Sequence, residues 1–341
     1  MKAAVVGCGI MGRTHAKNWV SVPGVELVGV CDIDKDLADK VAGSNKTKAY
    51  TSFAELLEAE KPDVVSVCVP TYLHKELVLQ AAEAGVHIVC EKPIASTLTD
   101  AAEMIAACKV HDVRLFIAHV VRFFPSYRDL SAKLKAGVIG EPGVIHTKRV
   151  GGHPGRAKSW YCDQEKSGGV ILDLLIHDID YLRSAVGEVE SVFALKRMTE
   201  EADYALVTLR FANGAIANLE GYWGYPGPFT TAVEMAGTKG VLRYHSDDAV
   251  SLKVLSSRKA SDIGPSVAVP KSPAYHDPYY YELEHFAQCL ANGTEPIVST
   301  EDAYQAMSIA FAAVASAQSG KPVRMDDFAQ ERALKGDNSD V

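Results

Sequence analysis

The residue best placed to do chemistry is Lys92, which lies in the tripeptide Glu91-Lys92-Pro93. The apolar run at 86–90 before it is typical of a buried strand, so we expect Lys92 at the carboxyl end of that strand. Open α/β sheets bind ligands at the carboxyl ends of their strands, and Pro93 limits the backbone freedom of the residue before it. Lys92 could therefore meet a cofactor and a substrate together. The alternative is a solvated surface lysine, the usual environment of this residue type.

Asp173 and His177 form a second candidate group, four residues apart in a segment expected to be helical from about 172 to 186. Residues four apart share one face of an α-helix. A histidine is the usual general base near neutral pH, and a nearby carboxylate can orient it and stabilise its protonated form. On spacing alone, a helix-surface pair without chemistry explains the pattern equally well.

A glycine-rich turn near the start of the chain supplies a third group. The segment Gly-Cys-Gly-Ile-Met-Gly at 7–12 follows a strand pattern and opens a helical one. In that context the first glycine makes a tight turn, the second admits a pyrophosphate, and the third allows close packing of helix on strand. The helix N-terminus then attracts the phosphates. The residues predicted to contact a dinucleotide here are Gly7, Gly9, Ile10, Met11 and Gly12.

Asp32 bears on the choice between NAD and NADP. It lies 20 residues past Gly12, at the end of the second strand pattern, where a carboxylate can accept from ribose hydroxyls. The simpler alternative is that Asp32 only caps the next helix. A carboxylate favours the free 2′-hydroxyl of NAD and repels the 2′-phosphate of NADP. Ile33 and Asp34 follow without an arginine, so NAD is the predicted cofactor; Lys35 keeps NADP as the less favoured alternative.

The sequence patterns around these candidate residues predict two domains with different folds. Over residues 1–120 six strand patterns alternate with helical ones, which predicts a doubly wound parallel Rossmann sheet. From residue 121 a helix is followed by β-rich runs, and Asn213-Gly214 is a hairpin signal between two of them. We therefore expect an NAD(P)-binding domain at 1–120. For 121–341 we expect an α+β substrate-binding domain with a large, mostly antiparallel open sheet.

Composition excludes several classes of protein. The chain has 43 acidic and 35 basic residues and no block of like charge, which argues against a nucleic-acid partner. No apolar run is long enough to span a membrane, and no signal peptide is evident. The seven cysteines form no Cys-x-x-Cys motif, so reduced thiols in the cytoplasm are expected. The histidines are scattered, so we expect no metal site.

Over nearly its whole length the chain resembles the glucose-fructose oxidoreductase, inositol dehydrogenase and rhizopine-catabolism superfamily. His15 completes the family's N-terminal signature, Gly-x-Gly-x-x-Gly-x-x-His, and Glu91-Lys92-Pro93 is its hallmark tripeptide. Residues 69–74 are similar to the segment beside the nicotinamide ribose, and residues 168–177 to the entry of the catalytic helix. Outside the glycine turn, the implied cofactor contacts are Asp32, Val69, Pro70, Thr71, His74, Glu91, Lys92 and Arg122.

The resemblance implies that Lys92, Asp173 and His177 form the catalytic set. His177 would take the proton of a substrate hydroxyl, and Lys92 would bond the same oxygen and stabilise the alkoxide. Asp173 would orient the base or a substrate hydroxyl, while hydride passes to the nicotinamide. In such proteins the bond between Lys92 and Pro93 is often cis, and we expect it here. One departure is Tyr161 after Trp160, where many members have arginine.

The substrate implied is a cyclic polyol or sugar, with inositol prominent. A locally basic stretch from His146 to Lys158 leaves an anionic sugar open, although these charges could simply face solvent. Family members assemble through the sheet of the second domain, which implies a homodimer or homotetramer. The expected substrate contacts are Lys92, Arg122, Lys158, Asp173, His177 and Tyr225, with His153 and His276 as weaker candidates.

Two other functions remain open on the same scaffold. One is a redox-neutral sugar enzyme in which tightly held NAD is reduced and reoxidised within one cycle. Substrate-dependent absorbance at about 340 nm would separate it from a dehydrogenase. The other is a non-enzymatic, NAD-sensing regulator. Retention of Lys92, Asp173 and His177 argues against the regulator, because a pure sensor needs no base.

Overall fold

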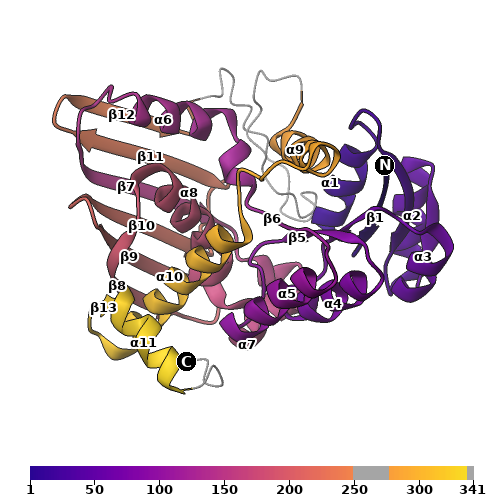
Figure 1. Cartoon of the computed structure of the whole chain (residues 1–341). Coiled ribbons are helices and arrows are strands. Elements are labelled where there is room, and N and C mark those ends of the chain that lie inside the picture. Colours follow the sequence, from indigo (N-terminus) through magenta and orange to yellow (C-terminus); the bar gives the residue numbers. More distant parts are fainter. Residues whose placement is uncertain (249–275, 336–341) are drawn as a thin grey trace. The chain divides into compact units, whose positions relative to one another are not determined.

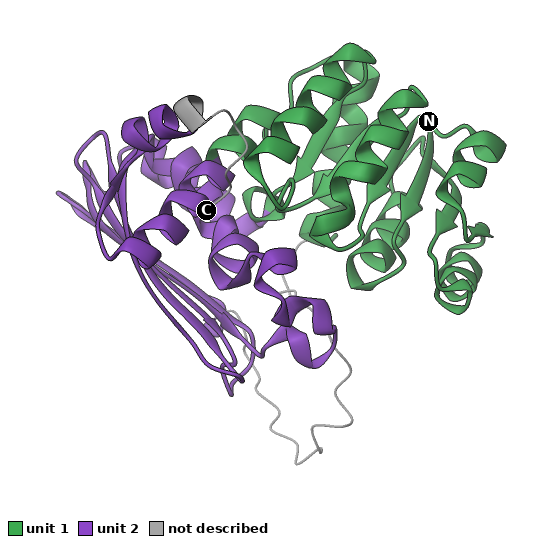
Figure 2. Cartoon of the chain, turned by 90° about the horizontal axis from the view of Figure 1, so that it is seen from below, with its two compact units in different colours: residues 1–123, 276–305 green, residues 124–275, 306–341 purple. Residues whose placement is uncertain are grey.

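The structure, a computed structural model, describes residues 1–248 and 276–335 of the chain (Figure 1). The described residues divide into two compact units, which Figure 2 draws in different colours. The first unit contains residues 1–123 and 276–305, and the second contains the other described residues. Each unit is built on one sheet, of six strands in the first and seven in the second.

The sheet of the first unit is entirely parallel, with strand order β3-β2-β1-β4-β5-β6. The chain starts in the middle of the sheet, winds outwards to β3 and returns to place β4 beside β1, which confirms the predicted doubly wound sheet. The strands are β1 (Lys2–Val6), β2 (Glu26–Cys31), β3 (Lys48–Tyr50), β4 (Val64–Val67), β5 (His87–Glu91) and β6 (Leu115–Ala118). The crossover helices are α1 (Ile10–Trp19), α2 (Lys35–Asn45), α3 (Phe53–Glu60), α4 (His74–Glu83) and α5 (Leu98–Val110).

A helix from far along the chain completes the first unit. The helix α9 (Pro278–Asn292) lies beside α1 in Figure 1, and Asn18 of α1 donates to the Asp277 side chain, which caps α9. Phe286 of α9 stacks on Phe116 of β6 with ring centroids 4.8 Å apart. The sequence pattern assigns residues 276–305 to the second domain, whereas in the structure they belong to the first unit. Burial of this apolar helix face against the parallel sheet explains the difference.

The sheet of the second unit is mixed, with strand order β12-β11-β7-β10-β9-β8-β13. Only β7 and β10 pair in parallel; the other neighbours are antiparallel, as the sequence predicts for most of them. The strands are β7 (Pro142–Gly151), β8 (Val189–Met198), β9 (Asp203–Phe211), β10 (Ile216–Trp223), β11 (Thr230–Gly237), β12 (Gly240–His245) and β13 (Val323–Arg324). The other helices of the structure are α6 (Pro125–Lys135), α7 (Gln164–Ser167), α8 (Ile176–Val186), α10 (Thr300–Ser319) and α11 (Met325–Lys335).

The two faces of the seven-stranded sheet differ. Helices α8 and α10 lie along one face, where Ser316 of α10 accepts from the backbone N–H of Ala194 in β8. No element of the described chain covers the opposite face, which we call the open face (Figure 2). Residues of β9 alternate strictly between buried and solvent-facing positions, as a sheet covered on one side requires.

The entry to α8 differs from the predicted continuous α-helix. Residues Val170–Leu175 form a π-helix, and the α-helix begins only at Ile176. Gly168 and Gly169 before it both have positive φ, 69° and 66°, and the buried Asp203 carboxylate accepts from the N–H of Val170 at 3.0 Å. The two glycines and the hydrogen bond to Asp203 together fix the start of the π-helix at Val170. Short π-helical turns are rare and occur frequently at functional sites.

Candidate active site

The predicted cofactor residues lie along one edge of the first sheet. The glycine turn follows β1, Asp32 follows β2, Val69 follows β4 by two residues, and Lys92 follows β5 directly. All six strands are parallel, so these residues lie at the carboxyl edge of the sheet. The strand order reverses between β1 and β4, which is where doubly wound sheets bind ligands. The sheet therefore brings the predicted cofactor residues of the first unit to one edge.

Two glycines of the turn, Gly7 and Gly12, have no room for a side chain. Gly7 has φ 89°, and a β carbon there would lie 2.7 Å from the backbone carbonyl of Cys68. A β carbon on Gly12 would lie 1.6 Å from the Gly7 oxygen, because α1 packs directly on the turn. The first turn of α1 contains no acidic residue, so its N–H groups present an unopposed positive end. This cradle fits the pyrophosphate of a dinucleotide.

Asp32 braces the glycine turn. Its Oδ2 accepts from the N–H of Cys8 at 2.6 Å, and its Oδ1 accepts from the N–H of Asp34 at 2.9 Å. The helix α2 is capped by Asp34 and not by Asp32, because the Asp34 side chain accepts hydrogen bonds from the backbone N–H groups of Asp36 and Leu37. Lys35, which a 2′-phosphate could otherwise use, is paired with Asp39. The Asp32 carboxylate thus lies at the end of β2 against the glycine turn, and its contact with the ribose of NAD stays a prediction.

Lys92 is half-buried where β5 ends, and its bond to Pro93 is cis, as expected. Its backbone N–H donates to Oε2 of the buried Glu91 at 3.2 Å. Oε1 of the same carboxylate lies 3.1 Å from Nε2 of the buried His15. Burial acts to raise the pKa of Glu91, but the hydrogen bond from His15 and the charges of Lys92 and His74 hold it below its usual value. Glu91 is therefore an anion next to Lys92.

His74 joins two loops at the carboxyl edge. Its Nδ1 lies 3.1 Å from the carbonyl oxygen of Pro93 and 3.3 Å from that of Ile94, and its Nε2 lies 3.1 Å from that of Val69. Burial acts to lower the pKa of His74, and these carbonyl contacts oppose it. Burial is the larger effect, so the pKa of His74 lies below its usual value. His74 was expected among the cofactor contacts; both its ring nitrogens face protein carbonyls.

Arg122 is buried in a 3₁₀ turn after β6. Its Nη1 donates to the carbonyl oxygen of Ile297 at 3.0 Å and lies 3.4 Å from Oδ2 of Asp302. The guanidinium was expected to contact cofactor and substrate, and the structure shows it tying the turn after β6 to the segment between α9 and α10. His276 also lies in the first unit, where its ring stacks on Tyr280 with centroids 3.7 Å apart.

Asp173 and His177 are the half-buried members of a buried segment. Asp173 is the one residue of the π-helix that is not buried, and His177 lies in the first turn of α8 between the buried Ile176 and Asp178. Gly221 of β10 lets the segment approach the sheet, since a β carbon there would lie 2.7 Å from Leu175. The local fold thus leaves an acid and a base partly accessible on a rigid support.

A buried ion pair anchors α8 to the sheet. Arg149 of β7 donates from Nε to Oδ2 of Asp178 at 2.6 Å and from Nη2 to Oδ1 at 3.3 Å. Asp178 is adjacent to His177, so the pair fixes the turn that carries the predicted base. Nη2 of Arg149 also donates to the hydroxyl of Tyr127 at 3.3 Å, and burial raises the pKa of Tyr127 to about 12. Arg149, a member of the predicted basic stretch, therefore neither faces solvent nor is free for a substrate.

The remaining predicted substrate residues have separate surroundings. Lys158 is exposed before a 3₁₀ turn. The Tyr225 ring packs edge-on against Tyr222 at 5.8 Å, and Lys148 Nζ lies 5.8 Å above it. Trp223 instead contacts His153 and Tyr161, with centroids 5.6 and 5.7 Å apart.

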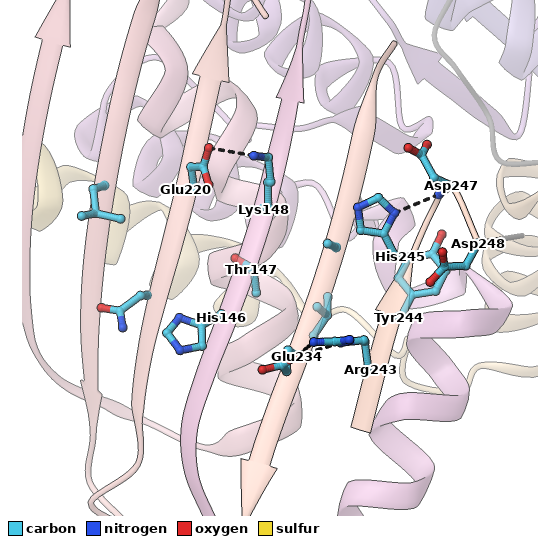
Figure 3. Close-up of a pocket in the computed structure, with 14 residues that line it drawn as sticks. His146, Thr147, Lys148, Glu220, Glu234, Arg243, Tyr244, His245, Asp247 and Asp248 are labelled. Atoms are coloured by element: carbon cyan, nitrogen blue, oxygen red, sulfur yellow. Dashed lines mark hydrogen bonds and ion pairs between the residues drawn. The ribbon is translucent and has the colours of Figure 1, made fainter. Parts of the chain in front are cut away.

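A hollow of about 710 Å³ lies on the open face, away from these groups. Figure 3 shows its lining side chains on β7, β10, β11 and β12. The pairs Lys148–Glu220 and Arg243–Glu234 cross it, with N–O separations of 3.1 and 2.5 Å. None of the predicted catalytic residues lines it, so this hollow is not the candidate active site.

Sequence reasoning missed the residues that hold the candidates in place. Asp203, Asp178 and Glu91 each accept hydrogen bonds in buried positions, and no local pattern marks their partners. Among the described residues, no cluster of three or more potential metal ligands occurs. Within the same residues, no helix has the length and apolar character needed to cross a bilayer.

Two family models match the chain. Residues 1–119 match the NAD-binding Rossmann fold of an oxidoreductase family, and residues 132–325 match the C-terminal alpha/beta domain of that family. Together they cover most of the chain.

Individual relatives agree with the family models. The chain is 31% identical over 338 residues to a myo-inositol 2-dehydrogenase of Thermotoga maritima, covering 96% of this chain and 99% of the relative. It is 32% identical over 338 residues to an NAD(+) scyllo-inositol 2-dehydrogenase of Bacillus subtilis, covering 96% of each. A crystal structure of a probable dehydrogenase from Thermotoga maritima superimposes with a TM-score of 0.83 at 29% identity, covering 96% of this chain and 100% of that one.

The sheet order, the glycine cradle and these matches agree with the resemblance inferred from the four motifs. The chain belongs to the glucose-fructose oxidoreductase, inositol dehydrogenase and rhizopine-catabolism (Gfo/Idh/MocA) family and is an NAD-dependent oxidoreductase.

Proposed function

We propose that this enzyme oxidises a secondary hydroxyl of a cyclic polyol or sugar, with an inositol as the first candidate. The observation that carries the proposal is the position of Lys92 at the end of β5, on the same sheet edge as the glycine cradle and Asp32. Two relatives that match nearly the whole chain are named as inositol 2-dehydrogenases, which supports a polyol as the substrate class.

In the proposed reaction each candidate residue has one task. Bound NAD would supply the acceptor for the hydride that leaves the carbinol carbon. His177 takes the hydroxyl proton, since imidazole is an effective base near neutral pH. Lys92 donates a hydrogen bond to the same oxygen and stabilises its developing negative charge. Asp173 orients the imidazole or a neighbouring hydroxyl of the substrate.

A substrate panel tests this proposal. Inositols, aldoses, glucosides and sugar phosphates are assayed with NAD and with NADP, following reduced cofactor at about 340 nm. We expect turnover of a polyol with NAD, and a loss of about 100-fold in kcat for Lys92→Ala. The matched control is Lys109→Ala, an exposed lysine on α5. Full turnover by a folded Lys92→Ala enzyme would remove Lys92 from the mechanism, and product without absorbance change would favour a redox-neutral reaction.

Lys158 and Tyr225 are proposed as additional substrate contacts. Lys158 is exposed in the loop that precedes the π-helix bearing Asp173, and it could bind an anionic group. We expect Lys158→Ala to raise KM for sugar phosphates or uronates more than for neutral polyols. The Tyr225 hydroxyl could donate to a substrate hydroxyl, so we expect Tyr225→Phe to raise KM for polyols, and an unchanged KM would remove Tyr225 from the substrate contacts.

We also propose that the enzyme is a homodimer or homotetramer that assembles through the open face. Large apolar side chains are exposed there, including Leu195 (56%) and Leu206 (46%) on the neighbouring strands β8 and β9 and Val241 (59%) on β12. Leu195 and Leu206 are cross-strand partners, so their surfaces are continuous. All seven cysteines are unpaired thiols, which supports the cytoplasm as the compartment.

A further inference from the structure

A chain of buried polar side chains runs through the first unit and ends at Lys92. Trp19 Nε1 lies 2.8 Å from Ser66 Oγ, and Ser66 Oγ lies 3.0 Å from His15 Nδ1. His15 Nε2 lies 3.1 Å from Glu91 Oε1. Trp19, Ser66 and His15 are 0% exposed and Glu91 is 7% exposed, so water does not compete for these bonds. The residues come from α1, β4 and β5, so the chain of bonds links one helix to two adjacent strands.

The hydrogen atoms of this chain can be placed by counting donors and acceptors. The indole of Trp19 can only donate, so Ser66 Oγ accepts from it. The Ser66 hydroxyl then has its own hydrogen available for His15 Nδ1. With Nδ1 as an acceptor, the ring carries its hydrogen on Nε2 and donates it to Glu91. This arrangement satisfies every polar atom of Trp19, Ser66 and His15 and directs all hydrogen bonds towards one carboxylate.

The carboxylate passes this constraint on to Lys92. One oxygen of Glu91 accepts from His15, and the other accepts from the backbone N–H of Lys92 at 3.2 Å. Rotation of the carboxylate would break both bonds together. The direction of the Lys92 backbone is therefore coupled, through Glu91 and His15, to the helix that begins at the glycine turn.

A purely structural role does not explain why these positions are polar. Ser66 lies in the strand Val64–Val67, whose other members are all valine, and an apolar residue of similar size would fill its site. Replacing buried ionic or polar groups by well-packed apolar ones is often neutral or stabilising. A fully satisfied buried network instead fixes one geometry among several.

We infer that Ser66, His15 and Glu91 are positioning residues, which hold the backbone of Lys92 in the direction its catalytic role requires. Glu91 was expected among the cofactor contacts, but both its carboxylate oxygens face protein groups, so we assign it a role that acts through Lys92. The inference rests on the proposed function of Lys92, and it goes further in assigning a task to the histidine that ends the N-terminal signature.

Glu91→Gln tests the inference with almost no change in shape. A carboxylate accepts at both oxygens, whereas an amide accepts at only one, so with the His15 hydrogen on Nε2 the variant loses either the His15 bond or the Lys92 bond. We expect kcat to fall by about 100-fold with KM for NAD little changed, as for a small misplacement of a catalytic group. Ser66→Ala removes the hydroxyl that bonds Trp19 and His15 and leaves the Glu91 carboxylate intact. We expect a smaller fall in kcat, of about tenfold.

Glu60→Gln is the matched control. Glu60 is also a buried carboxylate of the first unit that accepts from two side chains, Lys48 at 2.7 Å and Tyr50, but it lies at the end of α3. The same chemical change there should lower the melting temperature and leave kcat unchanged. If Glu60→Gln lowers kcat as much as Glu91→Gln, then loss of a buried charge and not of positioning is responsible, and the inference fails.

Two further measurements separate failure of the inference from failure of the proposed function. In Glu91→Gln the backbone amide of Lys92 should exchange with deuterium about tenfold faster, whether or not any polyol is turned over. An unchanged exchange rate overturns the inference. In the background of Lys92→Ala, Glu91→Gln should cost nothing more in kcat, because both changes remove one function. Additive losses also overturn it, whereas full turnover by Lys92→Ala itself would overturn the proposed function alone.

Discussion

The neighbours of Lys92 show how a flexible side chain can be directed from its backbone. Glu91 holds the N–H of Lys92, and His74 contacts the carbonyl oxygens of Pro93 and Ile94 just after it. The same His74 reaches the carbonyl oxygen of Val69 at the end of the adjacent strand. The segment that bears Lys92 is therefore held on both sides by buried groups, so little conformational freedom remains to be lost when substrate binds.

The Glu91 carboxylate should make stability depend on acid pH. Its pKa in the folded protein lies below the usual value of 4.5, so the unfolded chain binds its proton more tightly. The stabilisation is thus fully present above about pH 4.5 and is lost as pH falls through the folded pKa. The Glu91→Gln variant has no carboxylate to titrate at this position. The difference in unfolding free energy between the original protein and the variant should therefore shrink as pH falls from about 6 to about 3. Urea titrations of both proteins check this, and a constant difference would contradict it.

Asp32 should control the choice of cofactor. Removing its charge in Asp32→Asn leaves the oxygen that can accept from Cys8 but no longer repels a 2′-phosphate. We expect the ratio of kcat/KM for NAD over NADP to fall by about tenfold or more. Asp34→Asn, two residues on at the cap of α2, is the control and should leave the ratio unchanged. An unchanged ratio in Asp32→Asn would mean that another group sets the preference.

At this scale the sequence reveals residues whose neighbours are close in the chain. The glycine turn, Asp32 and Lys92 could be found because their spacing from strand patterns carries the signal. The partners of these residues could not, because His15 and Glu91 are 76 positions apart and Arg149 and Asp178 are 29 apart. Such pairs are set by how strands and helices pack, which a single sequence does not record.

The π-helix before α8 is the element that most distinguishes the second unit. It carries five buried apolar residues and the half-buried Asp173, and it starts from two glycines with positive φ. The α-helical period predicts the helix and its apolar face, but it cannot predict the wider turn. That turn depends on the Asp203 carboxylate from β9 and on the close approach to Gly221 of β10.

The packing of α1 on the glycine turn should tolerate no side chain. We expect Gly12→Ala to abolish NAD binding, since the new methyl group would lie 1.6 Å from the Gly7 oxygen. Gly43→Ala in α2 is the control, because Gly43 is exposed and has no atom near its β carbon. That change should stabilise the protein by about 0.5–1 kcal/mol. Calorimetric titration with NAD and thermal unfolding measure both effects; NAD binding by Gly12→Ala would show that α1 can shift.

Removing one partner of the ion pair that anchors α8 should strongly lower the free energy of unfolding. Arg149→Met leaves the fully buried Asp178 charge unpaired, and we expect a loss of about 3–5 kcal/mol in unfolding free energy. The double variant Arg149→Met, Asp178→Leu should recover most of that loss. Lys148→Ala, which removes the neighbouring exposed pair with Glu220, should change stability by less than about 1 kcal/mol. Equal losses from the buried and exposed pairs would contradict this account.

For the whole molecule, the alternation of strand and helix patterns predicts both fold types. It does not predict that α9 joins the first unit, because the α9 sequence shows only an amphipathic helix and does not indicate which sheet it packs against. Its place in the first unit is decided by the match between Leu283, Phe286 and the apolar surface of α1 and β6. Membership of a core is a property of the packed structure.

The open face should control the oligomeric state. Leu206→Lys places a charge beside the exposed Leu195, so we expect the oligomer to dissociate to monomers in sedimentation experiments. Val110→Lys adds the same charge at an 80% exposed position on α5 and should leave assembly intact. An oligomer that survives Leu206→Lys would place the interface elsewhere.

The late arrival of α9 has a consequence for how this protein is made. When the ribosome has released residues 1–123, all six parallel strands exist, but Phe116 and Phe123 still lack the Phe286 ring that packs against both. The nascent Rossmann sheet therefore has an apolar surface uncovered while about 150 residues of the second unit are translated, which takes about 8–30 s at typical elongation rates. Chaperone binding during that interval, and aggregation of a 1–123 fragment expressed alone, are the expected results of building the first unit from both ends of the chain.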